Sequence, residues 1–397
     1  MADRVPQIPE RDALLASVER IAPVLEASAE QSDRLRHLPP ETIDALDDAD
    51  VFRCMHPREL GGFEADPLTQ QEVIEAVAYH DASAAWCAFI GAGSSAFAAA
   101  MLPEAGFDEV CAAQPAGRRW PRFAGGPSPA GQAEPVDGGY RLSGRWGWAS
   151  GIHHADWVFG GAAILRDGEP QPTDFGMPLA RVMVMPRADV EVEDTWQTMG
   201  LRGTGSTHFS CRDVFVPEGR TFAFPFPEAQ RGGALFRLPM LGFFGPAFSG
   251  FPTGIARRAL DDVLGLSARR VRLGQTQSLA ERAVFHRDSG AAEGRVRAAA
   301  ALVRVELDAL WSRLHSGVEP SPVASARLLQ SFTNNVESAI ATAEMAYRYG
   351  GGDAVYASSP LQRHVRDLRV ASQHILVSEM NHEALGKALV TQASLEG

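Results

Sequence analysis

The residue pattern changes character twice along the chain, and the order of the resulting segments constrains the fold more than any other feature. From Glu10 to about Leu102, apolar residues recur at three- and four-residue spacing, which predicts amphipathic helices. Between Trp120 and Phe222, glycine, proline and turn dipeptides separate short runs rich in Val, Phe, Trp and Tyr, which predicts β-strands. Helical spacing then returns, and it predicts long helices over Gly254–Arg272, Ala291–Leu314, Val323–Tyr349 and Arg366–Ala393.

This order predicts an α+β protein with an N-terminal helical domain over residues 1–115, a central β domain over 116–230 and a C-terminal helical bundle over 231–397. A chain of 397 residues with 45% hydrophobic content can bury a sizeable core. The formal net charge of -12 argues against nucleic acid and anionic membranes as partners, since both attract a basic face. We therefore expect small molecules and proteins as partners.

The cysteines, the N-terminus and the lack of a long apolar run predict a cytoplasmic protein. The four cysteines show no C-x-x-C spacing, so we expect neither a metal site nor a disulfide framework, and free thiols suit a reducing compartment. The N-terminus has no apolar signal region, and we expect no run of about 18 apolar residues that could span a membrane. No Gly-x-Gly-x-x-Gly lies between a strand and a helix, which argues against a nicotinamide site in this chain.

Three segments together resemble the acyl-CoA dehydrogenase superfamily, and in particular its flavin-dependent monooxygenase branch of two-component, group D aromatic hydroxylase-like proteins. They are Gly144-Arg-Trp-Gly-Trp-Ala-Ser-Gly-Ile152 with His154-Ala-Asp-Trp157, Trp196–Ser206 running on to Asp213–Pro217, and Tyr349-Gly-Gly-Gly-Asp353 with Pro360–Arg363 and Arg366-Asp367. The resemblance implies an acyl-CoA dehydrogenase-like fold, with an N-terminal helical domain, a central β domain and a C-terminal four-helix bundle. It also implies a homotetramer.

One departure from the family pattern bears on the chemistry. In short- and medium-chain acyl-CoA dehydrogenases, a glutamate between the Gly-Gly motif and the following proline abstracts a proton. By register against Pro360, that position falls on Ser358 here, and serine cannot act as a carboxylate base near neutral pH. Asp353 sits five residues too early. Because some family members place the base on another helix, this weakens the dehydrogenase interpretation without eliminating it.

The segment Ala371-Ser-Gln-His-Ile375 is predicted to lie on the next helix, and the resemblance implies that its His374 faces flavin and substrate. With an ordinary pKa of about 6.5, a histidine there could protonate the nascent peroxide and then stabilise or deprotonate a phenol-like substrate. A hydrogen-bonded histidine on a buried helix face is the structural alternative. The histidines at 153, 154, 364 and 382 are weaker candidates.

The resemblance also implies a cofactor site. Ser150 lies where the branch places a hydroxyl near flavin N5, and Trp148 and Ala149 should flank the ring, although a Trp-rich strand can simply be core. Arg270, in the loose motif Arg270–Gly274, could reach a flavin phosphate across a subunit boundary. Arg202 and Thr204 could approach the cofactor or the adjoining subunit, and a turn role for the surrounding glycines is equally compatible with the sequence.

Candidate substrate-binding residues come from two aromatic segments. Trp86 begins a segment that resembles the helix carrying a substrate-facing histidine in phenol-hydroxylating members, and Ser94 stands at the position of that histidine. This puts a para-hydroxyphenyl substrate in doubt. Phe244 and Phe248 suit a flat apolar substrate, and a role in the core is equally compatible with the sequence. With the glycines and Pro246 around them, they are predicted to form a pocket rim rather than a regular helix.

The sequence thus predicts the oxygenase component of a two-component flavin-dependent monooxygenase that hydroxylates an aromatic or heteroaromatic molecule through a flavin C4a-hydroperoxide. Its expected cofactor is reduced FMN or reduced FAD, with molecular oxygen as co-substrate. A separate NAD(P)H:flavin reductase is the expected partner. Alternatives are N- or S-oxygenation by the same intermediate, an acyl-CoA dehydrogenase with a displaced base, and a flavin-less binding or scaffold protein.

Overall fold

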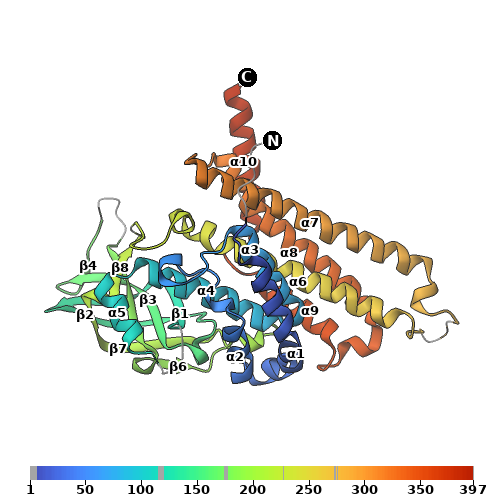
Figure 1. Ribbon diagram of the computed structural model, residues 1–397, viewed down its shortest axis with the longest axis horizontal. Coiled ribbons are helices and arrows are strands. Elements are labelled where there is room, and N and C mark those ends of the chain that lie inside the picture. Colours follow the sequence, from blue (N-terminus) through green and yellow to red (C-terminus); the bar gives the residue numbers. More distant parts are fainter. Residues whose placement is uncertain are drawn as a thin grey trace.

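The computed structural model describes residues 7–114, 120–173, 178–226, 228–271, 274 and 276–396. A β-sheet occupies one end of the molecule, and long helices extend from it toward the other end (Figure 1). The chain runs from helices through the sheet and back to helices, so the predicted α+β order is confirmed. The exact domain limits at 115/116 and 230/231 stay a prediction.

The N-terminal part is helical, as its apolar spacing predicts. Asp66 and Asp81 begin two of these helices by accepting hydrogen bonds from backbone N–H groups of the first turn, which are otherwise without helical partners. The helices are α1 (Arg11–Leu35), α2 (Pro40–Asp48), α3 (Pro67–His80), α4 (Ala82–Met101) and α5 (Glu104–Ala112).

Helix α4 corrects one expectation. Among the described residues, this one helix is long and apolar enough to cross a membrane, although no such segment was expected. Many of its residues are alanine, glycine or serine, so the segment does not look strongly apolar in the sequence, but it carries no charged side chain. In the folded chain, 89% of the apolar window is buried inside the protein. The helix therefore forms the centre of the core, which is why it is apolar on all sides.

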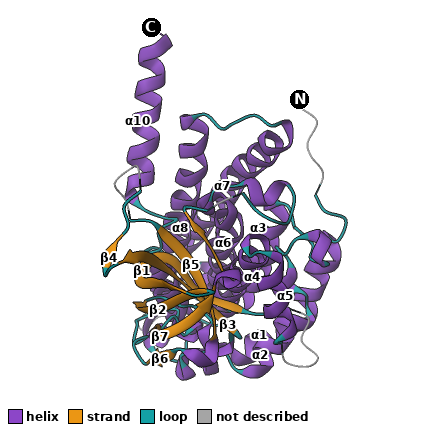
Figure 2. Cartoon of the chain, turned by 90° about the vertical axis from the view of Figure 1, so that its left-hand side faces the viewer, coloured by secondary structure: helices purple, strands orange, loops and turns teal. Residues whose placement is uncertain are grey.

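The sheet places the strand order β6-β7-β2-β1-β3-β5-β8 side by side, with β4 paired to β3 (Figure 2). β1 and β3 pair in parallel, and the other pairs are antiparallel. Alternate residues of β5 point to opposite faces of the sheet and enter two different hydrophobic cores. Val182 and Val184 belong to the main core, and Met183 and Met185 belong to a smaller one. The strands are β1 (Phe123–Val136), β2 (Gly139–Trp146), β3 (Trp157–Arg166), β4 (Glu169–Pro170), β5 (Ala180–Pro186), β6 (Glu191–Glu193), β7 (His208–Pro217) and β8 (Thr221–Phe224).

Four C-terminal helices pack against one another, and a fifth projects away from the body (Figure 1). The packed helices are α6 (Met240–Ser267), α7 (Ala283–Ser316), α8 (Pro322–Gly350) and α9 (Pro360–Ala371), and the projecting helix is α10 (Glu379–Glu396). The prediction of one continuous helix over Arg366–Ala393 was wrong, because the chain turns between α9 and α10. This turn lets the adjacent residues Leu376 and Val377 both enter the core.

The predicted irregular rim around Phe244 and Phe248 was also wrong, since both residues lie within the regular helix α6. The glycines of this segment serve close packing rather than turns. A Cβ atom at Gly250 would lie 2.0 Å from the carbonyl oxygen of Gln71 on α3. Only a glycine fits at such an approach of two helix backbones.

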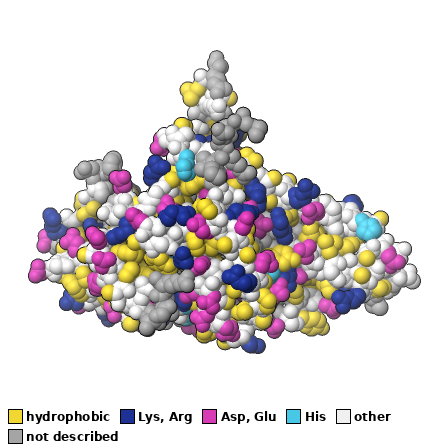
Figure 3. Space-filling model, viewed as in Figure 1, with side chains coloured by type: hydrophobic (Ala, Val, Ile, Leu, Met, Phe, Trp, Pro, Cys, Tyr) yellow, Lys and Arg dark blue, Asp and Glu magenta, His cyan; other side chains and the backbone are white. Residues whose placement is uncertain are grey.

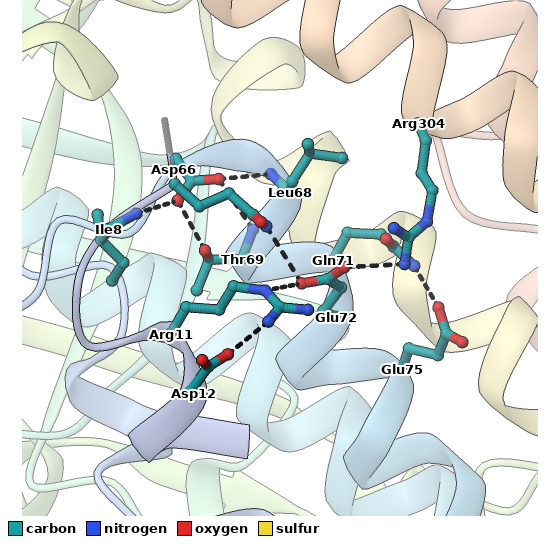
Figure 4. Close-up of polar contacts among 11 residues, drawn as sticks. Ile8, Arg11, Asp12, Asp66, Leu68, Thr69, Gln71, Glu72, Glu75 and Arg304 are labelled. Atoms are coloured by element: carbon teal, nitrogen blue, oxygen red, sulfur yellow. Dashed lines mark hydrogen bonds and ion pairs between the residues drawn. The ribbon is translucent and has the colours of Figure 1, made fainter. Parts of the chain in front are cut away.

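Charged side chains join α3 to α1 and α7 at the edge of this helix packing (Figure 4). Glu72 on α3 pairs with Arg11 Nε at 2.5 Å and with Arg304 Nη2 at 2.8 Å. One turn further along, Glu75 pairs with Arg257 at 3.1 Å, and burial raises the pKa of the Glu75 carboxyl. These ion pairs tie helices from both helical parts of the chain together. Figure 3 shows acidic and basic side chains interspersed over the face of the molecule that is seen in Figure 1.

Candidate functional site

Trp86 is the centre of an aromatic cluster in which helices α4 and α6 meet the turn after α9. Its ring, 7% exposed, lies edge-on to the rings of Phe89 on α4 and Phe248 and Phe251 on α6, with centroid distances of 5.7, 6.1 and 5.2 Å. The imidazole of His374, from the turn after α9, lies 5.3 Å from the same indole. The structure therefore brings Trp86, Phe248 and His374 together, as the sequence-based site requires.

The indole nitrogen of Trp86 connects this cluster to the β domain. Its Nε1–H donates to Ser150 Oγ at 3.1 Å. Ser150 Oγ lies 2.6 Å from Ser206 Oγ, which lies 2.6 Å from Thr204 Oγ1. Thr204 Oγ1 in turn donates to the carbonyl oxygen of Leu201 at 2.8 Å. Sequence reasoning missed Ser206, whose signal is a hydroxyl two residues after Thr204 in the glycine-rich segment.

Backbone hydrogen bonds hold the two loops that carry these hydroxyls. The N–H groups of Ala149 and Gly151 donate to the carbonyl oxygens of Thr207 and Thr204, at 3.1 and 3.0 Å. The glycine-rich loop includes a single 3-10 turn, Arg202–Thr204, that Gly205 ends with a left-handed φ of 54°. The site is thus built on two loops that are hydrogen-bonded to each other. Gly205 has the turn role that the sequence also allowed for the glycines around Arg202 and Thr204.

Asp367 on α9 fixes the start of this glycine-rich loop. Its carboxylate accepts a hydrogen bond of 2.6 Å from the backbone N–H of Leu201. Burial raises the pKa of Asp367 to about 7, against the opposing effects of that hydrogen bond and of Arg363 and Arg366. Asp367 is part of the third segment that resembles the family. Its hydrogen bond to Leu201, 166 residues away in the sequence, becomes apparent only in the folded structure.

Trp148 has two features that a purely structural tryptophan lacks. Its side chain is 75% exposed, and its φ of 59° places it in the left-handed region that a bulky residue rarely adopts. The nearest ring is that of His208, 6.2 Å away. Such strain persists where the surrounding structure imposes it and is often found at binding sites. A large exposed apolar face two residues before Ser150 suits a flat aromatic ligand such as a flavin ring.

His374 is neutral in this environment. Burial lowers the pKa of its imidazole to about 4. Its Nδ1 accepts a hydrogen bond of 3.3 Å from the backbone N–H of Leu376, so the ring proton resides on Nε2. This corrects the expectation of a group that titrates near neutral pH, and it corrects the helical position, since His374 lies in the turn between α9 and α10. What His374 offers at pH 7 is an Nε2–H donor.

The face of α4 that meets the aromatic cluster presents Trp86, Phe89 and Gly93, at spacings of three and four residues. A Cβ atom at Gly93 would lie 2.4 Å from the ring of Phe244, which itself lies 6.2 Å from Phe89. Ser94, buried at 3% exposure, is one position further round the helix. The absence of a side chain at Gly93 therefore makes room for Phe244 beside Phe89, a role that the sequence did not reveal.

The two arginines predicted for the cofactor lie in different places. Arg202 is half-buried in the glycine-rich loop, and its Nε is buried without a hydrogen-bond partner among the described residues. An orphaned guanidinium N–H is costly and suits an anionic ligand. Arg270 instead follows the C-terminal end of α6 and pairs with Asp353, which follows α8. Arg272 and Leu273 of its motif lie outside the described residues.

This geometry also bears on the dehydrogenase alternative. Asp353, the nearest carboxylate to the expected base position, has a side chain that is 78% exposed and paired with Arg270. Ser358 is exposed in a turn before α9. Neither residue faces the cluster around Trp86 and His374, so neither is placed to abstract a proton there.

Comparison with known proteins agrees with the fold. Residues 9–113 match the acyl-CoA dehydrogenase N-terminal domain, and residues 247–379 match the acyl-CoA dehydrogenase C-terminal domain. The protein is thus of the acyl-CoA dehydrogenase-like class. The chain is 33% identical over 372 residues to an indole-3-acetate monooxygenase of Pseudomonas putida, which covers 92% of this chain and 90% of that protein. It belongs to the flavin-dependent monooxygenase branch of the acyl-CoA dehydrogenase superfamily.

Two further relatives support this assignment. The flavin-dependent monooxygenase oxygenase subunit HsaA of Mycobacterium tuberculosis is 29% identical, over 92% of this chain and 93% of that protein. Among solved structures, XiaF from Streptomyces, in complex with FADH2 and glycerol, superposes with a TM-score of 0.85 at 26% identity and covers 96% of each chain. The protein is accordingly a flavin-dependent oxidoreductase enzyme.

Proposed function

We propose that this enzyme is the oxygenase component of a two-component monooxygenase and that it hydroxylates an aromatic or heteroaromatic small molecule. The observation that carries the proposal is the junction at Trp86. One edge of this indole hydrogen-bonds to the hydroxyl of Ser150, two residues after the exposed Trp148, and the ring packs against His374 and phenylalanines. A cofactor-contacting surface and an aromatic substrate environment thereby share one residue.

The residues around Trp148 fit a flavin. Trp148 offers an exposed ring face, Ser150 a hydroxyl, and Arg202 an unpaired guanidinium N–H for a negatively charged group. Reduced FMN or reduced FAD, when bound, supplies the electrons that activate molecular oxygen. Because no nicotinamide-binding motif lies in this chain, a separate NAD(P)H:flavin reductase would provide the reduced flavin. The name of the HsaA relative, an oxygenase subunit, supports this division of labour.

The substrate would lie against the partly exposed His374, whose ring stacks on the buried Phe248 at a centroid distance of 5.6 Å, so that the aromatic cluster forms an apolar wall behind a flat molecule. The neutral His374 would donate its Nε2–H to an oxygen of the substrate or to the oxygen being transferred, which aligns the reacting atoms and stabilises developing negative charge. The aromatic substrate in the name of the Pseudomonas putida relative supports this substrate class.

We also propose a homotetrameric assembly and a cytoplasmic location for this enzyme. A homotetramer would let Arg270, remote from the cluster within one chain, approach a flavin phosphate bound by a neighbouring subunit. We propose a cytoplasmic enzyme without nucleic-acid or membrane partners, in keeping with its net charge of -12. The division into domains 1–115, 116–230 and 231–397 belongs to the same proposal.

The test separates oxygenation from dehydrogenation. The purified chain is titrated with reduced FMN and reduced FAD without oxygen, then mixed with isotopically labelled dioxygen and a panel of aromatic acids, phenols and indoles that includes indole-3-acetate. We expect tight binding of one reduced flavin and one labelled oxygen atom in a hydroxylated product. Reduction of bound oxidised flavin by an acyl-CoA, with no labelled product from any aromatic compound, would instead establish a dehydrogenase.

A further inference from the structure

The hydroxyls behind Ser150 form a hydrogen-bonded series whose direction is fixed by its last member. Each hydroxyl has one proton to donate. Thr204 gives its proton to the carbonyl oxygen of Leu201, which can only accept. The close contact between Thr204 and Ser206 therefore requires Ser206 to be the donor. The contact between Ser206 and Ser150 then requires Ser150 to be the donor. Every proton in the series points away from Ser150.

Trp86 reinforces this direction at the other end. An indole nitrogen can only donate, so Ser150 Oγ accepts the Trp86 proton while its own proton is given to Ser206. One lone pair of Ser150 Oγ is then left for a ligand, and no proton is left. Ser150, Ser206 and Thr204 are each at most 5% exposed, so bulk water does not compete for these hydrogen bonds.

We propose that this directed series, Ser150 to Ser206 to Thr204 to Leu201, makes the site selective for reduced over oxidised flavin. The inference rests on the proposed function and on the family resemblance, which implies that the Ser150 hydroxyl lies near flavin N5. In reduced flavin N5 carries a hydrogen and donates, whereas in oxidised flavin N5 has a lone pair and accepts. If Ser150 Oγ can act only as an acceptor, it forms a hydrogen bond with the N5–H of reduced flavin. With oxidised flavin, the lone pair of Ser150 Oγ faces the lone pair of N5, and the two repel each other.

Ser206 and Thr204 are positioning residues in this scheme, since they act through Ser150. Their own place is fixed by the backbone. The Thr204 carbonyl oxygen accepts from Gly151 N–H at 3.0 Å and from Cys87 Sγ at 3.7 Å. The loop that carries Thr204 and the loop that carries Ser150 are thereby held together, so a change at the Thr204 hydroxyl alters proton direction while the backbone stays in place.

The matched variants are Thr204→Val, which removes the hydroxyl at nearly constant shape, and Thr204→Ser, which keeps it. Without the Thr204 hydroxyl, Ser206 is free to donate to Ser150, and the Ser150 proton becomes available to an acceptor. Ser206→Ala releases the same proton by a second route. We expect both Thr204→Val and Ser206→Ala to bind oxidised flavin more tightly, while Thr204→Ser retains the wild-type preference.

The measurement is the dissociation constant of FMN and FAD, each oxidised and reduced, by quenching of tryptophan fluorescence without oxygen. We expect wild type to favour the reduced form by about tenfold to a hundredfold, the ratio that one buried hydrogen bond produces, and the two variants to lose most of that ratio. Thermal melting of the flavin-free proteins checks that each variant is folded. The indole N–H resonance of Trp86 gives a second readout, since its shift should change in Ser206→Ala and not in Thr204→Ser.

The possible results separate the two proposals. If wild type prefers reduced flavin but Thr204→Val and Ser206→Ala keep the full preference, the directed series is not the cause and the proposed function stands. If folded wild type binds neither flavin in either redox state, the proposed function fails, and with it this inference. Loss of preference in both variants and its retention in Thr204→Ser would establish the series as the determinant.

Discussion

The backbone N–H of Leu376 donates to His374 Nδ1 at 3.3 Å, and this contact leaves the Nε2–H of a neutral ring as the group that His374 can offer. We therefore expect His374→Ala to lower the product formed per flavin oxidised by about tenfold or more, with hydrogen peroxide released instead. His374→Gln keeps a side-chain N–H donor and should lose less.

The low pKa of His374 leads to a prediction about how catalysis depends on pH. Because burial lowers the pKa of His374 to about 4, its ionisation should contribute no step to kcat/KM between about pH 5.5 and 8. The check is to compare pH profiles of wild type and His374→Gln with a substrate that does not ionise in this range. A step near the ordinary histidine pKa, present in wild type and absent in the variant, would show that a charged imidazole takes part.

Asp367 should make stability depend on pH. Its carboxyl has a pKa of about 7 in the folded chain and about 3.9 when unfolded, so the folded state binds more protons between these values. The free energy of unfolding should therefore fall as pH rises across this range, by up to about 1.4 kcal/mol per pH unit. Asp367→Asn cannot ionise and should remove this slope. Unfolding midpoints of both proteins from about pH 5 to 8 give the comparison, and parallel curves would contradict the raised pKa.

Trp148→Gly should separate stability from cofactor binding. The left-handed φ of 59° costs a non-glycine residue about 1–2 kcal/mol, and the side chain is 75% exposed and buries little. We expect the flavin-free variant to melt at or above the wild-type temperature, since relief of strain offsets the greater freedom of glycine in the unfolded chain. Its dissociation constant for reduced flavin should rise about tenfold. A clear loss of stability with unchanged flavin binding would assign Trp148 a structural role.

Glu72 should matter for stability although it is remote from the site. Glu72→Gln removes a charge that is paired with both Arg11 and Arg304, and its side chain is 8% exposed while the arginines are 30% and 41% exposed. We expect a loss of about 1–2 kcal/mol in the free energy of unfolding, less than for a fully buried pair because the arginines remain partly hydrated. Glu19→Gln, on the exposed surface of α1, is the control and should change stability by less than about 0.5 kcal/mol.

The order of helical and β segments could be predicted because it depends on local residue spacing. The position of His374 could not, since nothing between Ala371 and Glu379 resembles a helix-breaking proline or glycine, and the turn there follows from burying Leu376 and Val377 together. Glycine was similarly misleading in α6, where Gly250 permits contact with α3. Both errors arose where tertiary packing decides the local structure.

The candidate site could be predicted only in part, because motifs identify single residues and the fold decides which of them meet. Trp86, Ser150 and His374 were identified one by one from motifs, and the structure brings them into contact. The contact of Trp86 with Ser150 joins residues 64 positions apart, and Ser206 and Asp367 act through partners that no local pattern names. Which side chain donates to which is a property of the assembled loops, so proton direction could not be inferred from the sequence.

The bond between Asp367 and Leu201 also limits how molecules can enter and leave. Beside it, Arg366 donates to the carbonyl oxygen of Met199 at 2.5 Å and pairs with Asp33 of α1 at 3.3 Å. Arg366 and Asp367 thus hold α9 to the start of the glycine-rich loop, and Arg366 also links α9 to α1. A movement of the sheet away from the helices would break several of these bonds at once, so we expect the body of the enzyme to stay rigid. Cofactor and product should then enter and leave on the side of the exposed Trp148.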